Sequence, residues 1–123
     1  MRIGRRMGMI ALGLMTTTAS APSAHRLVVV VGQPSDARVT QQHAWLEQDA
    51  AALRERDVVV QDIAPEVARR ERPELGVRSQ TAFEVLLVGK DGGVKLRRAK
   101  PVETSEITAL IDTMPMRQNE VRR

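Results

Sequence analysis

Two short apolar runs, separated by a segment of helical periodicity, most constrain what this chain of 123 residues can fold into. The first run, RLVVVVG at residues 26–32, is continuous, β-branched and closed by a glycine. Such a run is typical of a strand that is buried on both faces, as in the parallel part of a sheet. The second run, DVVVQDI at residues 57–63, has the same character. A right-handed crossover between them would make the two strands parallel neighbours.

The segment QQHAWLEQDAAALRER, at residues 41–56, lies between the two runs and predicts one continuous helix. Leu46 and Leu53 fall on the face that we expect to be buried. Thr40 directly precedes the segment and is suited to be its N-cap, because a threonine hydroxyl accepts a hydrogen bond from a free N–H of the first turn.

The stretch AFEVLLVGKDGGVKLRR, at residues 82–98, predicts a β-hairpin. Two apolar runs, at residues 83–88 and 94–98, flank the turn formers of Lys90-Asp91-Gly92-Gly93. Apolar and basic residues alternate in the second run, so we expect that strand to have one wet face and to lie at a sheet edge. A short helix is expected within residues 65–75, before Pro73.

The stretch TSEITALIDTM, at residues 104–114, predicts the closing helix, with Thr104 as its cap. Pro115 cannot continue a helix and is expected to end it. The helix has a complete apolar stripe at Ile107, Leu110, Ile111 and Met114.

The predicted order is therefore β-α-β-(α)-β-β-α, in an α/β three-layer sandwich with a mixed sheet. A parallel β-α-β unit, then an antiparallel hairpin and a closing helix, is the order of a thioredoxin-like core. We predict one such domain over residues 25–123.

Residues 1–24 have the layout of a secretory signal peptide: arginines, a short apolar run, and then small residues. We expect cleavage near residues 21–24 and an exported protein, periplasmic or secreted. The alternative is an uncleaved N-terminal anchor. The apolar run is too short for a stable transmembrane helix, and no stable membrane span is expected in the mature chain.

Composition excludes several classes of function. The chain has no cysteine, which rules out disulfides, thiolate catalysis and thiolate metal sites. Its net charge is +4, but residues 1–24 hold three arginines and no acid, so the mature part carries only +1. Trp45 and Phe83 are the only aromatic residues. With no basic stripe and no interleaved aromatics, nucleic-acid binding is not expected.

The strings RLVVVV, LRERDVVVQDI, FEVLLVGKDGGVKLR and LIDTMPMRQNEVR resemble the bacterial domain-of-unknown-function 4174 family. The resemblance covers residues 26–123, and related segments occur in some animal extracellular proteins with sushi repeats. It implies a thioredoxin-like or peroxiredoxin-like fold. An oxidoreductase role has been proposed for such domains by analogy of fold. A shared fold does not by itself imply a shared activity.

Both halves of a thioredoxin redox site are missing from this sequence. The segment after the first strand, GQPSDARVTQQ at residues 32–42, has no thiol. The segment before the third strand, RSQTAFEV at residues 78–85, lacks the proline that a thioredoxin places there. Because thiol-disulfide exchange needs a thiolate nucleophile, this chain cannot perform it alone.

The loop at residues 32–40 is a candidate anion site, because a helix N-terminus presents free N–H groups. Ser35, Arg38 and Thr40 would help to hold a phosphate or a carboxylate. The alternative, an ordinary capped turn, is the simpler interpretation. A hydrolase set of Ser35, Asp36 and His43 has no nucleophile-elbow motif to support it.

Metal binding would rest on two histidines and two methionines, His25, His43, Met114 and Met116. Thioethers suit Cu(I), but the set is sparse, and Met114 also fits the core stripe. We therefore predict no metal site and no cofactor.

Charged residues beyond what local structure demands are the stronger binding candidates. The hairpin turn needs its glycines and not Lys90, and the helix stop needs Pro115 and not Arg117. The predicted binding residues are Lys90, Asp91, Lys95, Asp112 and Arg117.

Two classes of function follow. The favoured one is a non-catalytic exported module that binds an envelope protein or a small anionic ligand. The alternative is an enzyme of oxidoreductase-like ancestry with unknown, non-thiol chemistry at the loop of residues 32–40.

Overall fold

The computed structural model describes residues 23–122 and has a mixed α/β fold. The predicted signal peptide therefore lies outside the described residues, except for its last two. Within residues 23–122, no helix is both long enough and apolar enough to cross a membrane. The elements in order are β1 (Arg26–Gly32), α1 (Ala37–Gln48), α2 (Ala50–Glu55), β2 (Val58–Ile63), α3 (Pro65–Glu71), the 3-10 helix η1 (Pro73–Leu75), β3 (Phe83–Val88), β4 (Val94–Arg98), α4 (Thr104–Asp112) and α5 (Pro115–Val121).

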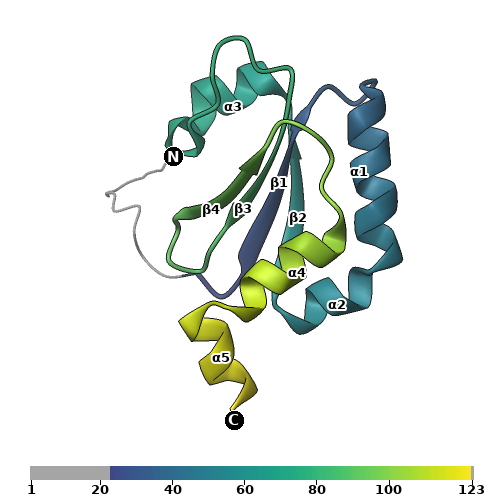
Figure 1. Ribbon diagram of the computed structural model, residues 1–123. Coiled ribbons are helices and arrows are strands. Elements are labelled where there is room, and N and C mark those ends of the chain that lie inside the picture. Colours follow the sequence, from purple (N-terminus) through teal and green to yellow (C-terminus); the bar gives the residue numbers. More distant parts are fainter. Residues whose placement is uncertain (1–22, 123) are drawn as a thin grey trace, which may run out of the picture.

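The four strands form one mixed sheet in the order β2-β1-β3-β4 (Figure 1). Strand β1 pairs in parallel with β2 and antiparallel with β3, and β3 pairs antiparallel with β4. The predicted parallel pair, the hairpin and the edge position of its second strand are confirmed. So is the short helix before Pro73, which is α3.

Helices cover both faces of the sheet. Val28 and Val30 face a core shared with α1, α2 and α4, in which Leu46 and Leu53 are buried as predicted. Val29 and Val31 face the opposite core, which contains Leu75 of η1. All four valines are at most 1% exposed. Strand β1 is thus buried on both faces, because successive side chains point to opposite sides of the sheet.

The first helix differs from the prediction at both ends. It begins at Ala37, because Asp36 is the N-cap and its side chain accepts a hydrogen bond from the Arg38 N–H. The prediction that Thr40 is the N-cap was therefore wrong, because Thr40 lies inside the first turn of α1. The prediction of one continuous helix was also wrong, since α1 ends at Gln48 and α2 begins at Ala50. The break falls at Asp49, a residue whose side chain competes with helical hydrogen bonds.

The C-terminal helix ends at Asp112, two residues before the predicted end at Met114, and a further helix follows it. Met114, directly before Pro115, has an extended backbone and is the N-cap of that further helix. In the stripe, Ile107 and Ile111 are fully buried, and Leu110 and Met114 pack against the same core. Thr104 is the first residue of α4 and not its cap, which is Glu103. Pro115 both follows the end of α4 and occupies the first turn of α5, where its missing N–H costs nothing.

A buried glutamine joins α1 to the segment before α4. Gln42 is fully buried, its Nε2 donates to the Val102 carbonyl at 2.8 Å, and its Oε1 accepts from the Val102 N–H at 2.7 Å. The amide thus satisfies both backbone groups of a residue that is itself only 3% exposed. This pair of bonds holds the two helices over the same face of the sheet.

We expect Gln42→Leu to lower the free energy of unfolding by roughly 2 to 4 kcal/mol, because two buried backbone groups lose their partner. Urea unfolding followed by circular dichroism measures the change. Gln41→Leu is the matched control, since Gln41 lies next to it on the exposed side of α1. Equal stability of the two variants would contradict this role for Gln42.

Candidate functional site

A pocket of about 520 Å³ opens between α1 and the carboxyl ends of the parallel strands β1 and β2. Gly32 closes β1 at its base, where a Cβ would lie 2.6 Å from Val39 Cγ2, so only glycine fits. The lining contains both apolar and polar residues. The apolar part comes from Pro34, Val39 and Ala44, and the polar part from Thr40, His43, Glu47 and Asp62.

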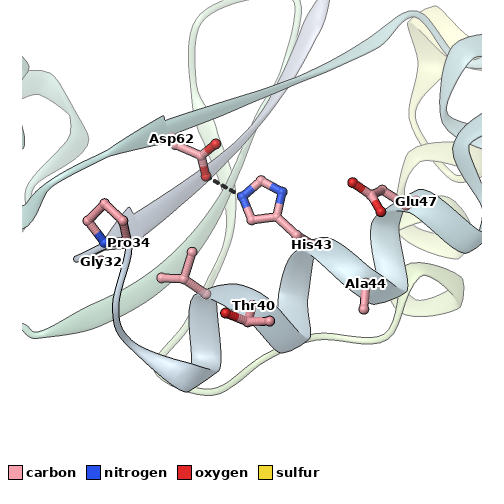
Figure 2. Close-up of a pocket in the computed structure, with 8 residues that line it drawn as sticks. Gly32, Pro34, Thr40, His43, Ala44, Glu47 and Asp62 are labelled. Carbon is pink, nitrogen blue, oxygen red and sulfur yellow. Dashed lines mark hydrogen bonds and ion pairs between the residues drawn. The ribbon is translucent and has the colours of Figure 1, made fainter.

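A histidine-carboxylate pair is the chemical centre of this pocket. His43 Nε2 on α1 lies 2.5 Å from Asp62 Oδ1 at the end of β2. Figure 2 shows the His43 ring between Asp62 and Glu47, which follows one turn later on α1. The His43 side chain is 32% exposed and that of Asp62 is 56% exposed, so the pair is open to a ligand. The carboxylate orients the imidazole, while a second carboxylate lies nearby.

The pocket continues along β2 as a second hollow of about 300 Å³, which we name the β2 groove. It shares His43, Glu47 and Asp62 with the pocket. Its walls are lined by Leu46, Ala50, Leu53, Arg54, Val58 and Val60. The groove is therefore apolar along its length. The carboxylates of Glu47 and Asp62 lie at one end, and the guanidinium of Arg54 lies at the other.

The predicted anion loop is occupied by the chain's own groups. The Asp36 carboxylate accepts hydrogen bonds from the Arg38 N–H at 2.9 Å and from its guanidinium at 3.0 and 2.7 Å. Hydrogen bonds from the Arg38 side chain and backbone lower the pKa of Asp36. The N–H and the positive charge expected to bind an anion thus already hold a carboxylate. Thr40 lines the His43–Asp62 pocket instead, and Ser35 is exposed.

The hydrolase set is not assembled, because His43 bonds to Asp62 and Asp36 bonds to Arg38. Within residues 23–122, no group of three or more histidine, cysteine or acidic residues is placed to hold a metal ion. Met116 is exposed, and Met114 packs on the core.

A network of ion pairs closes the opposite end of the sheet, where β1 begins. Arg26 is 1% exposed and donates to the Arg56 carbonyl at 2.8 Å and to both Glu120 carboxylate oxygens at 3.3 and 3.2 Å. Lys90 Nζ lies 2.8 Å from both Glu120 and Asp57. Burial alone would raise the pKa of Glu120, but hydrogen bonds from Lys90 and Arg26 outweigh it and lower that pKa to about 2.

A second limb of this network ties α4 and α5 to α2. Arg56 binds the Asp112 carboxylate at 2.9 and 3.0 Å, a contact that lowers the pKa of Asp112. Arg117 donates to the Glu55 carbonyl at 3.2 Å and to its carboxylate at 3.1 Å. Its Nε lies 3.7 Å from Asp112. We call both limbs together the basal network.

A model of the family described as Domain of unknown function (DUF4174) matches residues 19–120. The chain belongs to this family. Comparison with curated proteins and with solved structures finds no match. The matched range of the DUF4174 domain includes the His43–Asp62 pocket and, in Glu120, the last residue of the basal network.

The structure brings the five predicted binding residues of the DUF4174 domain to one end of the sheet. Asp91 and Lys95 pair at 2.8 Å on the hairpin, beside a hollow of about 140 Å³ that also borders Met114, Pro115 and Met116. Lys90, Asp112 and Arg117 belong to the basal network. The hairpin turn and the helix stop do not need Lys90 and Arg117, but both residues make tertiary contacts, with Asp57 and Glu120 and with Glu55. Their role in binding stays a prediction.

Two acidic residues that form ion pairs were not predicted from the sequence. They are Asp62, which pairs with His43, and Glu120, which pairs with Arg26 and Lys90. Asp62 lies near the carboxyl end of the second apolar run, and that position predicts proximity to the helix carrying His43. This signal was present and unused. Glu120 had no comparable signal, since it lies in a charged stretch whose helix α5 was not predicted.

Glu120→Gln tests the basal network through the pH dependence of stability. A carboxylate whose pKa falls from 4.5 to about 2 on folding stabilises the protein above pH 4.5, and that contribution is lost as pH falls toward 2. The shift corresponds to about 3 kcal/mol. We expect Glu120→Gln to lose about this much at pH 7 and to show a flatter acid limb in urea titrations.

Glu106→Gln is the control for this experiment. Glu106 pairs with Arg98 at 2.7 Å, but both side chains are about half exposed, so little stability is expected from the pair. A Glu120→Gln variant whose pH profile matches that of the control would contradict the network's role.

Proposed function

We propose that the DUF4174 domain is an exported, thioredoxin-like binding module without thiol chemistry, which holds a small ligand with an amine or other hydrogen-bond donor in the His43–Asp62 pocket. The observation that carries the proposal is the position and charge of this pocket. It lies at the carboxyl ends of two parallel strands, where open α/β sheets bind ligands. Its volume of about 520 Å³ falls in the range of small-molecule sites.

The thioredoxin-like assignment is supported by the strand order β2-β1-β3-β4 with one parallel and two antiparallel pairings. Helices α1 and α4 over one face and α3 over the other agree with it. The pocket lies where α1 follows β1, which is where a thioredoxin carries its working cysteines. This chain has no cysteine, so the position is free for a different use.

The lining favours a positively charged or hydrogen-bond-donating ligand over the anion expected from the sequence. Asp62 and Glu47 are carboxylates, and His43 is the only base among the lining residues. The apolar wall would take a short hydrocarbon part of the ligand. An ammonium group in the pocket would form a charge-assisted hydrogen bond with the free oxygen of Asp62 or with Glu47.

A pair of matched probes tests the pocket. We expect n-butylammonium, and not butyrate, to shift the amide resonances of Thr40 and Ala44 in nuclear magnetic resonance titrations. Asp62→Asn should weaken this binding by about tenfold, because it removes one charge-assisted contact. Asp91→Asn is the control, since it removes a carboxylate at the other end of the sheet.

Each outcome of the titration has a meaning. Preference for butyrate would support the anion-binding module in place of the proposed one. Failure of both probes would contradict a small-molecule pocket and favour a protein partner.

Export rests on the layout of residues 1–24. We expect the protein recovered from the envelope or medium of a bacterial host to begin between residues 22 and 25, as measured by mass spectrometry of its N-terminal peptide. A protein found only in the cytoplasm with its initial residues intact would contradict export.

The enzyme alternative is favoured by one observation, the His43–Asp62 contact. A carboxylate that orients an imidazole is the usual support of a general base. The described residues place no serine, cysteine or lysine among those lining the pocket. Thr40 supplies a hydroxyl to the lining, but among the described residues no hydrogen bond joins it to His43, whose Nε2 is bonded to Asp62. The base would therefore have to act on a bound water or a substrate. The binding module therefore needs fewer assumptions.

A further inference from the structure

We propose that two copies of the DUF4174 domain pair through β2, antiparallel about a two-fold axis at Val60, and so join their sheets into one. This inference does not depend on the ligand of the His43–Asp62 pocket. It rests on the contrast between the two edges of the sheet, on an apolar groove beside one of them, and on the charges at the ends of that groove.

The two edge strands differ in how they are protected (Figure 1). Strand β4 carries Lys95, Arg97 and Arg98 in five residues, and its pairing with β3 has a register shift. Basic residues and irregular pairing are the usual means by which proteins block strand addition. Strand β2 reads VVVQDI, pairs with β1 in unbroken register, and has Asp62 as its only charge. Within residues 23–122, no strand pairs with the outer edge of β2, so that edge can accept another strand.

Apolar surface flanks this open edge. On the side of α1 and α2, the β2 groove is floored by the buried Leu46 and Leu53, and Val60 beside them is partly exposed. On the other face, Val59 is 39% exposed, although it is a strand residue next to a buried one. A strand added to β2 would cover Val59 with one row of side chains and fill the groove with the other.

The pleat of the sheet restricts the register. Directly opposed residues of an antiparallel pair point to the same face, so the two-fold axis must pass through a residue and not between two. An axis at Val60 places Val58 opposite Asp62 and Val59 opposite Gln61. Axes at Val60 and at Gln61 each overlap five residues of β2 and set no two like charges opposite each other. Of the two, only the axis at Val60 sets Asp62 opposite Val58, which lines the groove together with Arg54.

Charge complementarity identifies a second copy as the partner. Glu47 and Asp62 lie at the end of the groove nearer the pocket, and Arg54 lines the groove with Val58, at the beginning of β2. Among the described residues, neither Glu47 nor Arg54 has an ion-pair partner, although Asp62 contacts His43. A two-fold axis at Val60 exchanges the two ends. It therefore brings Arg54 of each copy toward the carboxylates of the other.

This pairing would also change the ligand site. The second copy's Arg54 would stand beside the two carboxylates of the His43–Asp62 pocket and narrow its open side. The proposed function survives without the pair, because the pocket is lined entirely by one chain.

Sedimentation velocity over a range of concentrations tests the pairing on the protein as a host produces and processes it. We expect a dimer that dissociates on dilution. Arg54→Glu should weaken it by about tenfold or more, because it sets like charges together across the axis. Arg78→Glu makes the same charge change at an exposed residue that belongs neither to β2 nor to the lining of the groove, and it should leave the dimer intact.

Charge reversal separates pairing from misfolding. Arg54→Glu combined with Glu47→Lys should restore the dimer, since the attraction is re-formed with its signs exchanged. Val59→Lys should also give a monomer, with the urea midpoint that wild type has at concentrations where its dimer is dissociated. A monomeric wild-type protein, or a dimer insensitive to both Arg54→Glu and Val59→Lys, would overturn the proposal. Butylammonium binding to such a protein would leave the proposed function standing.

Discussion

The burial of β1 on both faces is the constraint on which the other elements depend. Its residues Val28–Val31 are at most 1% exposed, and their side chains alternate between the two cores. Each fully buried valine contributes on the order of 1.5 to 3 kcal/mol only if its face is covered. Helices α1, α2 and α4 cover one face, while α3 and η1 cover the other. The three layers follow from one short strand.

The same strand draws a charge into the interior at its first residue. Arg26 is 1% exposed, so its guanidinium needs partners that replace water. The Arg56 carbonyl and the Glu120 carboxylate supply them. Glu120 comes from α5, which means that the charged end of the chain is part of the fold. Asp57 also takes part in this arrangement. Its carbonyl accepts a hydrogen bond from the Arg26 N–H, and its carboxylate accepts one from Lys90. Its backbone has a φ of 57°, in the left-handed region.

Elements with a strong local pattern could be predicted from the sequence. The two valine runs, the hairpin around Asp91 and the stripe through Ile107 all have periodicities that need no tertiary context. The start of α1 could not be chosen by pattern alone, since Asp36 and Thr40 are both good caps. Helix α5 was missed because PMRQNEV has no apolar stripe and depends on ion pairs to residues far away in the chain. The His43–Asp62 pair likewise joins residues whose contact depends on the β-α-β crossover.

Charge pairing distinguishes the two ends of the sheet as surfaces. At the basal end, each basic residue of the network has an acidic partner from a different element, as Arg26, Lys90 and Arg117 show. These charges therefore stabilise the fold. Beside β2, Glu47 and Arg54 have no ion-pair partner among the described residues. Exposed charges on an apolar groove stabilise nothing within the chain, yet they cost nothing while water solvates them. They would stabilise a complex in which another molecule brings the opposite charge, and this is why both proposals, of a ligand and of a second copy, place their contacts on the β2 side.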